Sequence, residues 1–310
     1  MKDLKVIFMG TPDFAVPVLQ KLIENTNVVL VVTQPDKKIG RKQVLTPTPI
    51  KEEAEKHNIP VFQPIKIKEE YETILNTDAD IIITCAYGQI IPKIILDYPK
   101  YSCINVHASL LPKYRGGAPI HHCLINGDDK TGITIMYMAE KMDNGDIISQ
   151  IEYKIQDEDN VGTLHDKLSV LGANLLIDTL PSILNGANNR IKQDESKVTY
   201  AYNIKREDEK IDFTKTGIEI LNKIRGLNPW PLANFTIDGN EIKIFDASFK
   251  KEEVKDPGQI VVIDKNALGI SCKDGMIYLE RIKPFGKKEM PIKDYLNGVN
   301  KEDLKNKKVG

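Results

Sequence analysis

The chain has 310 residues, of which 41% are hydrophobic and 28% charged, and its formal net charge is −1. This length is too great for one ordinary small domain and fits two, and the composition is that of a soluble globular protein. The small net charge excludes binding to a polyanion through overall charge, so any nucleic-acid contact has to come from local patches.

The cysteines and the N-terminus predict a cytoplasmic protein. None of the four cysteines forms a C-x-x-C pair, and three lie in apolar runs, as buried thiols do in a reducing compartment. The first apolar run is too short for a signal peptide, and no stretch of about 18 apolar residues that could span a membrane occurs. No group of His, Cys, Asp and Glu has the spacing of metal ligands, so we expect no metal site.

Short apolar runs and helical patterns alternate through the first half of the sequence. We expect buried strands at 6–9, 28–32, 80–86, 103–106 and 132–138. We expect helices over 14–23, 50–57 and 160–184, the last broken at Pro181. Continuous apolar strands that alternate with helices are typical of a mainly parallel sheet with both faces covered.

The glycine pattern after the first strand argues against a dinucleotide site. Gly10 stands where a Rossmann fingerprint would begin, but only one of the three glycines is present. Pro12 and Asp13 would also block the close approach of a pyrophosphate. No G-x-x-x-x-G-K-[ST] motif occurs. We therefore expect a Rossmann-like fold without a nicotinamide or nucleoside triphosphate ligand.

The pattern changes in the second half of the chain. We predict a catalytic domain over 1–188, a linker over 189–207 and a C-terminal domain over 208–310. After a helix at 217–225, the C-terminal part has short strand-like runs separated by Asp-Gly and Pro-Gly turns. These runs lie at 235–237, 242–245, 259–263, 268–272 and 276–282. They favour a small OB-like β-barrel, which is a common platform for nucleic acids.

Three polar residues form a candidate catalytic set. Asn105 and His107 are two apart at the end of a predicted strand, so both side chains project from the same face where ligands bind in open α/β sheets. Asp143 lies in a tight turn after another strand. Taken singly, such residues are more often structural than catalytic.

An amide, an imidazole and a carboxylate suit acyl transfer to an amine. Asn105 can donate to a tetrahedral oxyanion, and a protonated His107 can donate to it as well and pass a proton to the leaving group. Asp143 can orient His107 or accept the amine proton through water. No nucleophilic Ser or Cys is needed, so no covalent intermediate is implied.

The segments 105–112, 115–120 and 142–146 resemble the signature of the folate-dependent formyltransferases. The resemblance implies a Rossmann-like formyltransferase domain, 10-formyltetrahydrofolate as the formyl donor, and catalysis by the matching Asn105, His107 and Asp143. It also implies a folate pocket along two loops. Its residues are Tyr87, Gly88, Ser109, Leu110, Leu111 and Pro112.

The acceptor is indicated by the loop over residues 34–50. From composition alone, its four basic side chains against one acid favour a solvated charged loop over contacts with phosphates. Its motifs 33–36, 40–41 and 47–51 resemble the insertion loop of the family members that formylate a charged tRNA. The resemblance implies methionyl initiator tRNA as the acceptor. The expected tRNA contacts are Lys37, Lys38, Arg41, Lys42, Lys205 and Arg206.

Two alternatives stay open at this point. One is an amino-sugar-nucleotide N-formyltransferase of the same two-domain plan. The other is a non-enzymatic RNA-binding protein that retains an inactive folate fold. Nothing in the sequence requires more than a monomer. Within the basic loop, Lys42-Gln43-Val44 departs from the more glycine- and lysine-rich run expected there.

Overall fold

The computed structural model describes residues 1–40, 42–305 and 307–310. The chain divides into two compact units. Unit 1 comprises Met1–Pro119, Lys130–Lys154 and His165–Tyr202. Unit 2 comprises Ile120–Asp129, Ile155–Leu164 and Asn203–Gly310. Because two short segments before residue 188 group with unit 2, the division is interleaved. The bounds 1–188, 189–207 and 208–310 stay a prediction.

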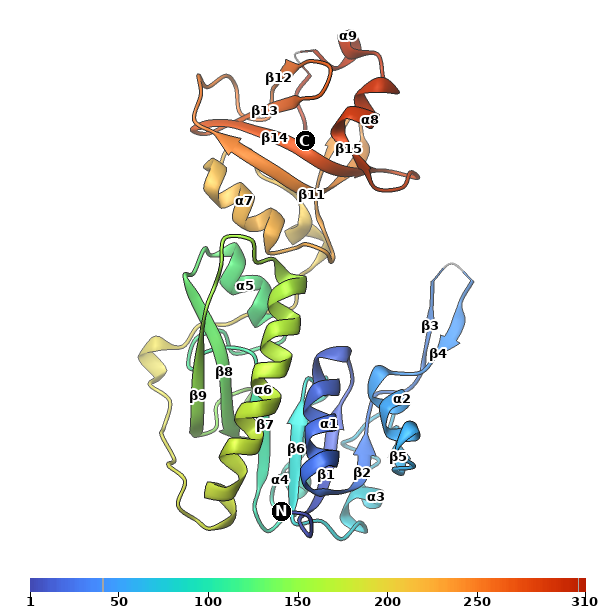
Figure 1. Ribbon diagram of the computed structural model, residues 1–310, viewed down its shortest axis with the longest axis vertical. Helices are drawn as coiled ribbons and strands as arrows, with labels where there is room; N and C mark the ends of the chain where they lie inside the picture. Colours follow the sequence, from blue (N-terminus) through green and yellow to red (C-terminus); the bar gives the residue numbers. More distant parts are fainter. Residues whose placement is uncertain (41, 306) are drawn as a thin grey trace. The chain divides into compact units, whose positions relative to one another are not determined.

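Unit 1 is built on one seven-stranded sheet (Figure 1). Its strand order is β5-β2-β1-β6-β7-β8-β9. The pairs from β5 to β7 are parallel, and β7-β8 and β8-β9 are antiparallel, which confirms the mainly parallel sheet. The strands are β1 (Lys5–Gly10), β2 (Asn27–Val32), β5 (Val61–Phe62), β6 (Ile81–Cys85), β7 (Cys103–His107), β8 (Lys130–Tyr137) and β9 (Ile147–Lys154).

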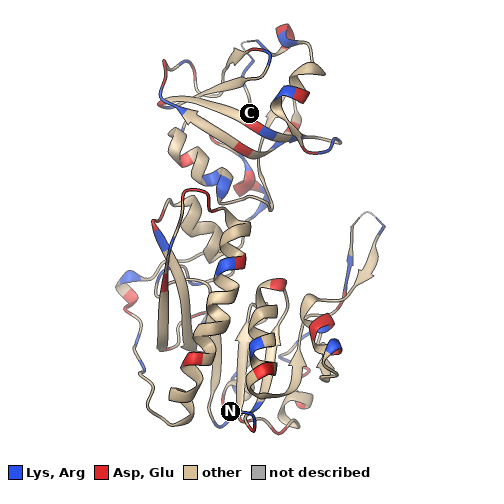
Figure 2. Ribbon diagram, viewed as in Figure 1, with Lys and Arg blue, Asp and Glu red and all other residues tan. Residues whose placement is uncertain are grey.

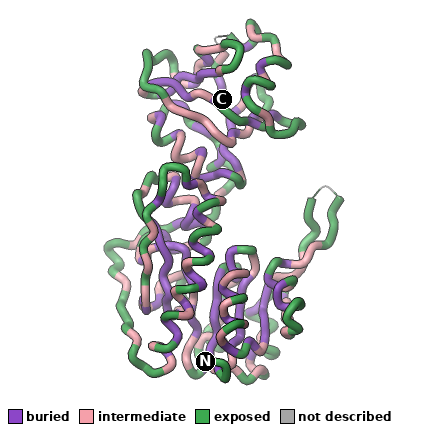
Figure 3. Tube along the Cα trace, in the orientation of Figure 1, coloured by how far each residue is buried: buried purple, intermediate pink, exposed green. Residues whose placement is uncertain are grey.

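Two of these strands are not predicted from the sequence. β5 has only two residues, which is too short to give a pattern. β9 alternates between more and less buried positions after its first two residues, as an outer strand with one covered face does. The strands β1, β6 and β7 are buried on nearly every residue, and the central strands of the sheet are coloured as buried in Figure 3.

The helices of the first half connect these strands. The 3-10 turn η1 (Asp13–Ala15) leads into α1 (Val16–Asn25), and α2 (Pro49–Lys56) begins at a Thr48 cap whose side chain accepts from Lys51 N. The short helices α3 (Glu72–Leu75) and α4 (Lys93–Leu96) follow. They were not expected, since a single helical turn carries no clear apolar period.

The long helix α6 (Val161–Leu184) runs through Pro181, so the predicted break there is wrong. Pro181 lies in the last turn, where its missing N–H removes one intrahelical bond, and its own carbonyl still accepts from Asn185 N. Gly172 lets this helix approach β7 and β8 closely, because a Cβ there would lie 2.9 Å from Val106 Cγ1.

Of the residues described, α6 forms the one helix long and apolar enough to cross a membrane by length and composition. The core helix of a soluble protein meets the same criteria. Four leucines along α6 have no solvent exposure, which is what a core helix requires: Leu164, Leu168, Leu176 and Leu180.

The predicted loop at 34–50 contains a β-hairpin. β3 (Lys37–Ile39) pairs antiparallel with β4 (Val44–Thr46), with Ile39 opposite Val44. Gly40 and Gln43 take positive φ angles of 72° and 50° in the connecting turn. Figures 1 and 3 show the hairpin projecting from its neighbours in unit 1 with exposed strands.

Unit 2 contains a sheet of antiparallel strands in the order β10-β11-β14-β13-β12, with β15 on β14, which confirms a small barrel-like domain. Its strands are β10 (Ala233–Ile237), β11 (Asn240–Lys250), β12 (Ile260–Ile263), β13 (Leu268–Cys272), β14 (Gly275–Pro284) and β15 (Met290–Pro291). Its other elements are α5 (Pro119–Ile125), whose first residue belongs to unit 1, α7 (Gly217–Arg225), α8 (Ile292–Asn297) and α9 (Lys301–Leu304).

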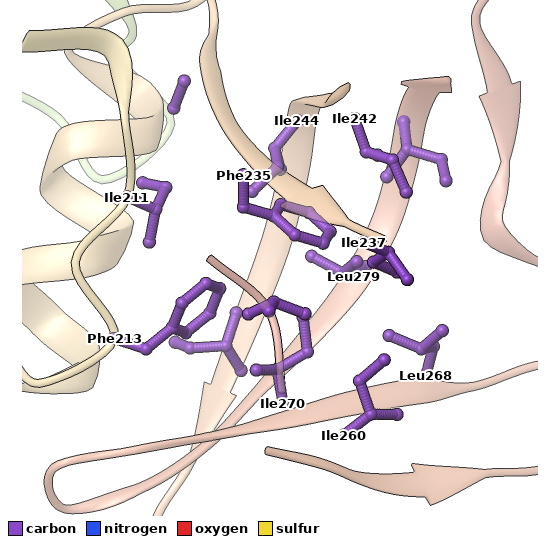
Figure 4. Close-up of a cluster of buried hydrophobic side chains, with 14 of the residues drawn as sticks. Ile211, Phe213, Phe235, Ile237, Ile242, Ile244, Ile260, Leu268, Ile270 and Leu279 are labelled. Carbon is purple, nitrogen blue, oxygen red and sulfur yellow. The ribbon is translucent and has the colours of Figure 1, made fainter. Parts of the chain in front are cut away.

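The core of unit 2 forms between this sheet and the segment before α7. Phe213 and Phe235 meet edge to face, with ring centroids 5.9 Å apart, among isoleucines and leucines of the strands (Figure 4). Helix α7 begins with a capping box between Thr216 and Glu219, so its N-terminus is fixed by local side chains.

All four cysteines are buried and none forms a disulfide, which agrees with the prediction of buried thiols for the three that lie in apolar runs. Burial raises the pKa of the Cys85 and Cys103 thiols well above their usual range. A raised pKa keeps a thiol protonated near neutral pH, so these two residues behave as small apolar side chains.

Candidate active site

The predicted site residues of unit 1 gather at one edge of the sheet. β6 and β7 are parallel neighbours, with Thr84 opposite Asn105, so their carboxyl ends lie together. Asn105 and His107 belong to β7 itself, while the segments 86–88 and 108–112 follow directly after the two strands. This is the edge at which ligands bind in open α/β sheets.

The structure brings His107 and Asp143 together. His107 Nδ1 lies 3.7 Å from Asp143 Oδ2, which is within ion-pair range and longer than a hydrogen bond. His107 Nε2 lies 3.0 Å from the carbonyl oxygen of Tyr114. A carbonyl only accepts, so this contact assigns a proton to Nε2 and leaves Nδ1 as the ring atom that faces the carboxylate.

Asp143 is held in an uncommon backbone conformation. Its φ is 48°, in the left-handed region that few residues other than glycine adopt. Its Oδ2 accepts from Gly116 N at 2.8 Å. Gln193 Nε2 donates to the carbonyl oxygens of Asp143 and Gly145, at 2.7 and 2.8 Å. These contacts fix the carboxylate beside His107.

Gln193 is not among the predicted site residues, because it lies in the predicted linker over 189–207. Gln193 Oε1 accepts from Arg115 Nε at 3.0 Å, and Arg115 Nη2 forms a 2.8 Å ion pair with Glu195. The Arg115 residue is only 2% exposed. Hydrogen bonding to Arg115 is the main reason that the pKa of Glu195 is lowered. A buried guanidinium therefore fastens the segment around Gln193 to the segment that carries Gly116, whose N–H donates to Asp143 Oδ2.

Asn105 is oriented by a neighbouring strand. Its Oδ1 accepts from Thr84 Oγ1 at 2.8 Å. Because the hydroxyl donates to the side-chain oxygen, the Nδ2 group is the donor that Asn105 offers to a ligand. This is the orientation that stabilisation of an oxyanion requires.

The loop after β7 is anchored on β8. Thr134 Oγ1 donates to Ser109 O at 2.6 Å and accepts from Leu111 N at 3.1 Å. The Ser109 hydroxyl is buried and donates to Lys113 O, so it closes the turn. Leu111 is also buried, whereas Leu110 and Pro112 are partly exposed.

In the loop after β6, backbone groups rather than side chains are accessible to a ligand. The Tyr87 side chain is buried in a cluster with Ile67 and Ile91, and burial raises the pKa of its hydroxyl. Gly88 is exposed with φ of 90°, a conformation that favours glycine. Three of the six expected folate residues are thus buried anchors, and three are accessible: Gly88, Leu110 and Pro112.

The expected tRNA contacts differ in their surroundings. Lys37, Lys38 and Lys42 are exposed on the hairpin and its turn, whose basic residues are blue in Figure 2. Arg41 lies outside the described residues. In unit 2, Lys205 is exposed and lies 3.6 Å from Glu207, and Arg206 pairs with Glu209 and Glu241.

Residues 1–40, 42–305 and 307–310 contain no group of three or more His, Cys, Asp or Glu that could hold a metal.

Two family models match the chain. Residues 4–180 match the model described as formyl transferase, and residues 203–300 match the formyl transferase C-terminal domain. The chain is 53% identical over 306 residues to a methionyl-tRNA formyltransferase of Bacillus cereus (strain G9842), covering 96% of this chain and 97% of that protein. It is 54% identical over 305 residues to the protein of the same name from Bacillus cytotoxicus, again covering 96% and 97%.

Solved structures share the fold. A sugar 3N-formyl transferase, crystallised in the presence of dTDP and 5-N-formyl-THF, has a TM-score of 0.68 at 23% identity, over 93% of this chain and 100% of that one. An N-formyltransferase from Helicobacter canadensis, in complex with folinic acid and dTDP-3-aminofucose, has a TM-score of 0.67 at 20% identity, over 91% and 100%. At these identities the likeness concerns the fold alone.

Proposed function

We propose, from the premise that this chain belongs to the formyl transferase family and within it to the methionyl-tRNA formyltransferases, that it transfers the formyl group of 10-formyltetrahydrofolate to the free amino group of methionyl initiator tRNA. The product, formylmethionyl-tRNA, serves translation initiation. The observation in the structure that carries the reaction is the His107–Asp143 pair beside Asn105 at the carboxyl edge of the sheet.

The reaction needs a stabilised oxyanion and two proton transfers. The amine adds to the formyl carbon, a C–N bond forms, and the carbonyl oxygen becomes negatively charged. The Nδ2 group of Asn105 and a protonated Nδ1 of His107 donate to this oxygen. The bond from the formyl carbon to the folate nitrogen then breaks, and that nitrogen takes a proton.

His107 exchanges protons through one ring atom in this proposal. Its Nε2 proton stays with Tyr114 O, so Nδ1 gives the proton to the leaving nitrogen. Asp143, 3.7 Å from Nδ1, stabilises the charged ring and accepts the proton of the attacking amine through water. Gln193 and Gly116 hold Asp143 in place throughout.

The folate donor is held by the loops after β6 and β7. Both loops start at the edge that carries Asn105 and His107, and the second is anchored on Thr134. The accessible groups are the backbone around Gly88 and the side chains of Leu110 and Pro112, while Tyr87, Ser109 and Leu111 support them from buried positions.

The tRNA is held through basic groups. Lys37, Lys38, Arg41 and Lys42 contact phosphates of the acceptor stem, and Lys205 does so from the linker over 189–207 that precedes the C-terminal domain over 208–310. Arg206 has to exchange its ion pairs with Glu209 and Glu241 for a phosphate, so its contribution is the smallest of the set. We propose a cytoplasmic enzyme that acts as a monomer.

The direct test compares two classes of acceptor. Purified protein and 10-formyltetrahydrofolate are incubated with charged initiator tRNA or with a dTDP-linked amino sugar, and formylated products are quantified. We expect product on the tRNA only. Formylation of the sugar without formylation of the tRNA would establish the alternative, an amino-sugar-nucleotide N-formyltransferase.

A further inference from the structure

Two tyrosines are exposed side by side on the segment that follows η2 (Glu195–Lys197). Tyr200 is 49% exposed and Tyr202 is 63% exposed. Their ring planes are 5° from parallel, and their centroids are 5.6 Å apart. They are two residues apart on an extended segment, so they share a face, while Ala201 between them is fully buried. The pair therefore presents two stacked, largely exposed aromatic rings to solvent.

The backbone beneath the two tyrosines is firmly placed. Arg115 N donates to Thr199 O at 2.9 Å, and Ala201 N donates to Arg115 O at 2.8 Å. Ala118 N donates to Ala201 O at 3.0 Å. Gly116 allows this close approach, because its φ is 126° and a Cβ there would lie 2.5 Å from Ala201 O.

The segment over residues 114–118, which pairs with the backbone of the two tyrosines, also forms hydrogen bonds to the candidate catalytic residues. Tyr114 O accepts from His107 Nε2, and Tyr114 N donates to Thr199 Oγ1 at 2.9 Å. Gly116 N donates to Asp143 Oδ2 at 2.8 Å. The aromatic pair is therefore one hydrogen-bonded segment away from both His107 and Asp143.

We infer that Tyr200 and Tyr202 form a stacking platform for the unpaired nucleotides at the 3′ end of the acceptor tRNA, an inference that rests on the proposed function. The amino group that receives the formyl group belongs to a methionine esterified to the terminal nucleoside. Those nucleotides therefore lie beside His107 and Asp143 when the amine reacts. Unpaired bases are recognised by stacking on aromatic side chains.

The charges around the platform are compensated, because Lys197, Lys205 and Arg206 each face a carboxylate, so they do not repel an RNA strand. From Ser196 to Arg206 the sequence has three basic residues and no acid. The nearest acids upstream are engaged, Asp194 with Lys197 at 3.2 Å and Glu195 with Arg115 at 2.8 Å. A phosphate backbone that passes the tyrosines thus meets no uncompensated carboxylate from this segment.

The platform is tested by the double substitution Tyr200→Ala with Tyr202→Ala in the full chain. With charged initiator tRNA we expect a KM at least about fivefold higher, as loss of base stacking implies, while kcat changes by less than about twofold. The double substitution to Phe retains the rings and should keep the wild-type KM. Phe285→Ala, which removes a 78% exposed ring from unit 2, serves as the matched control and should also leave KM unchanged.

A second measurement reports stacking directly. Uncharged initiator tRNA with 2-aminopurine as its terminal nucleotide should lose fluorescence on binding to wild type and to the double Phe variant, but not to the double Ala variant. Equal quenching and equal KM in the double Ala variant would overturn the inference, as would an equal KM rise in Phe285→Ala. Wild-type protein that formylates no charged tRNA contradicts the proposed function instead.

Discussion

At the residue scale, the two ring nitrogens of His107 have different partners. Nε2 is committed to Tyr114 O, and Nδ1 faces Asp143. We expect His107→Ala to lower kcat by about two to four decades, because it removes a donor to the oxyanion together with the acid. Steady-state formylation of charged initiator tRNA measures this.

The matched control for this substitution is His57→Ala, which removes an exposed imidazole that faces Glu53 at the end of α2. It should leave kcat within about twofold of wild type, since it alters only one contact, between this imidazole and Glu53, outside the candidate site. A fall of less than about tenfold in His107→Ala would remove this histidine from the chemical step.

Gln193 acts on the same site through the backbone. Its side-chain amide donates to Asp143 O and Gly145 O, and we expect Gln193→Ala to lower kcat about tenfold, as the loss of two hydrogen bonds allows. Gln193→Glu has the same shape but lacks the amide donors, so it should lower kcat at least as much. The KM for the folate donor should stay unchanged in both.

Gln20→Ala is the control for Gln193. It removes an exposed amide that donates to Glu53, outside the candidate site. Wild-type kcat in Gln193→Glu would show that the amide donors do not position Asp143. A raised folate KM with unchanged kcat would instead place Gln193 in donor binding.

The site residues that could be predicted from the sequence act through their own side chains at the site, whereas those that could not be predicted act through backbone contacts. Asn105 and His107 are predictable because strand periodicity places them on one face and the family signature spans them. Gln193 and the Tyr114 carbonyl were not, because each acts through a backbone contact. The Gln193 contact with Asp143 joins residues 50 positions apart, so only the folded chain reveals it.

At the element scale, the hairpin β3–β4 is the main difference from expectation. Its strands have three residues each, too few to show an alternating pattern among the lysines. The helix α6 shows the opposite case, since its length was predicted well and only the effect of Pro181 was overestimated. Short elements and local breaks depend on tertiary contacts more than on pattern.

The hairpin is expected to bind tRNA through its charge. We predict that Lys38→Ala with Lys42→Ala lowers kcat/KM for charged initiator tRNA at low salt and reduces the slope of log kcat/KM against log salt by about one per lost phosphate contact. Arg41→Ala should act in the same direction. Titration of activity against salt measures both quantities.

Lys68→Ala, which removes an exposed lysine of unit 1 outside the hairpin, is the control for this experiment. It should leave the slope unchanged. If the hairpin variants keep the wild-type slope, the hairpin is a solvated element that makes no phosphate contact.

At the scale of the whole molecule, two units share an interleaved chain. His121 Nδ1 lies 2.9 Å from Gly226 O, and Ile125 packs against the core of unit 2. Gly162 N donates to Asn228 O. The two-domain plan was predictable from the change of pattern near residue 188, but this interleaving was not, because it depends on contacts about 65 to 105 residues apart.

The interleaving predicts the behaviour of a truncated chain. A fragment of residues 1–202 loses the partners of His121, Ile125 and Gly162, so we expect it to unfold at a lower temperature than the full chain. Thermal unfolding followed by circular dichroism measures this. A fragment that unfolds at the same temperature as the full chain would show that segments 120–129 and 155–164 need nothing from residues 203–310.

We propose that the His107–Asp143 site moves a formyl group from a folate to the amino group of a charged initiator tRNA. The most direct test of this proposal is formyl transfer from 10-formyltetrahydrofolate to charged initiator tRNA, with charged elongator methionine tRNA as the comparison. We expect rapid formylation of the initiator and little of the elongator. Folate binding without transfer to either tRNA would contradict it.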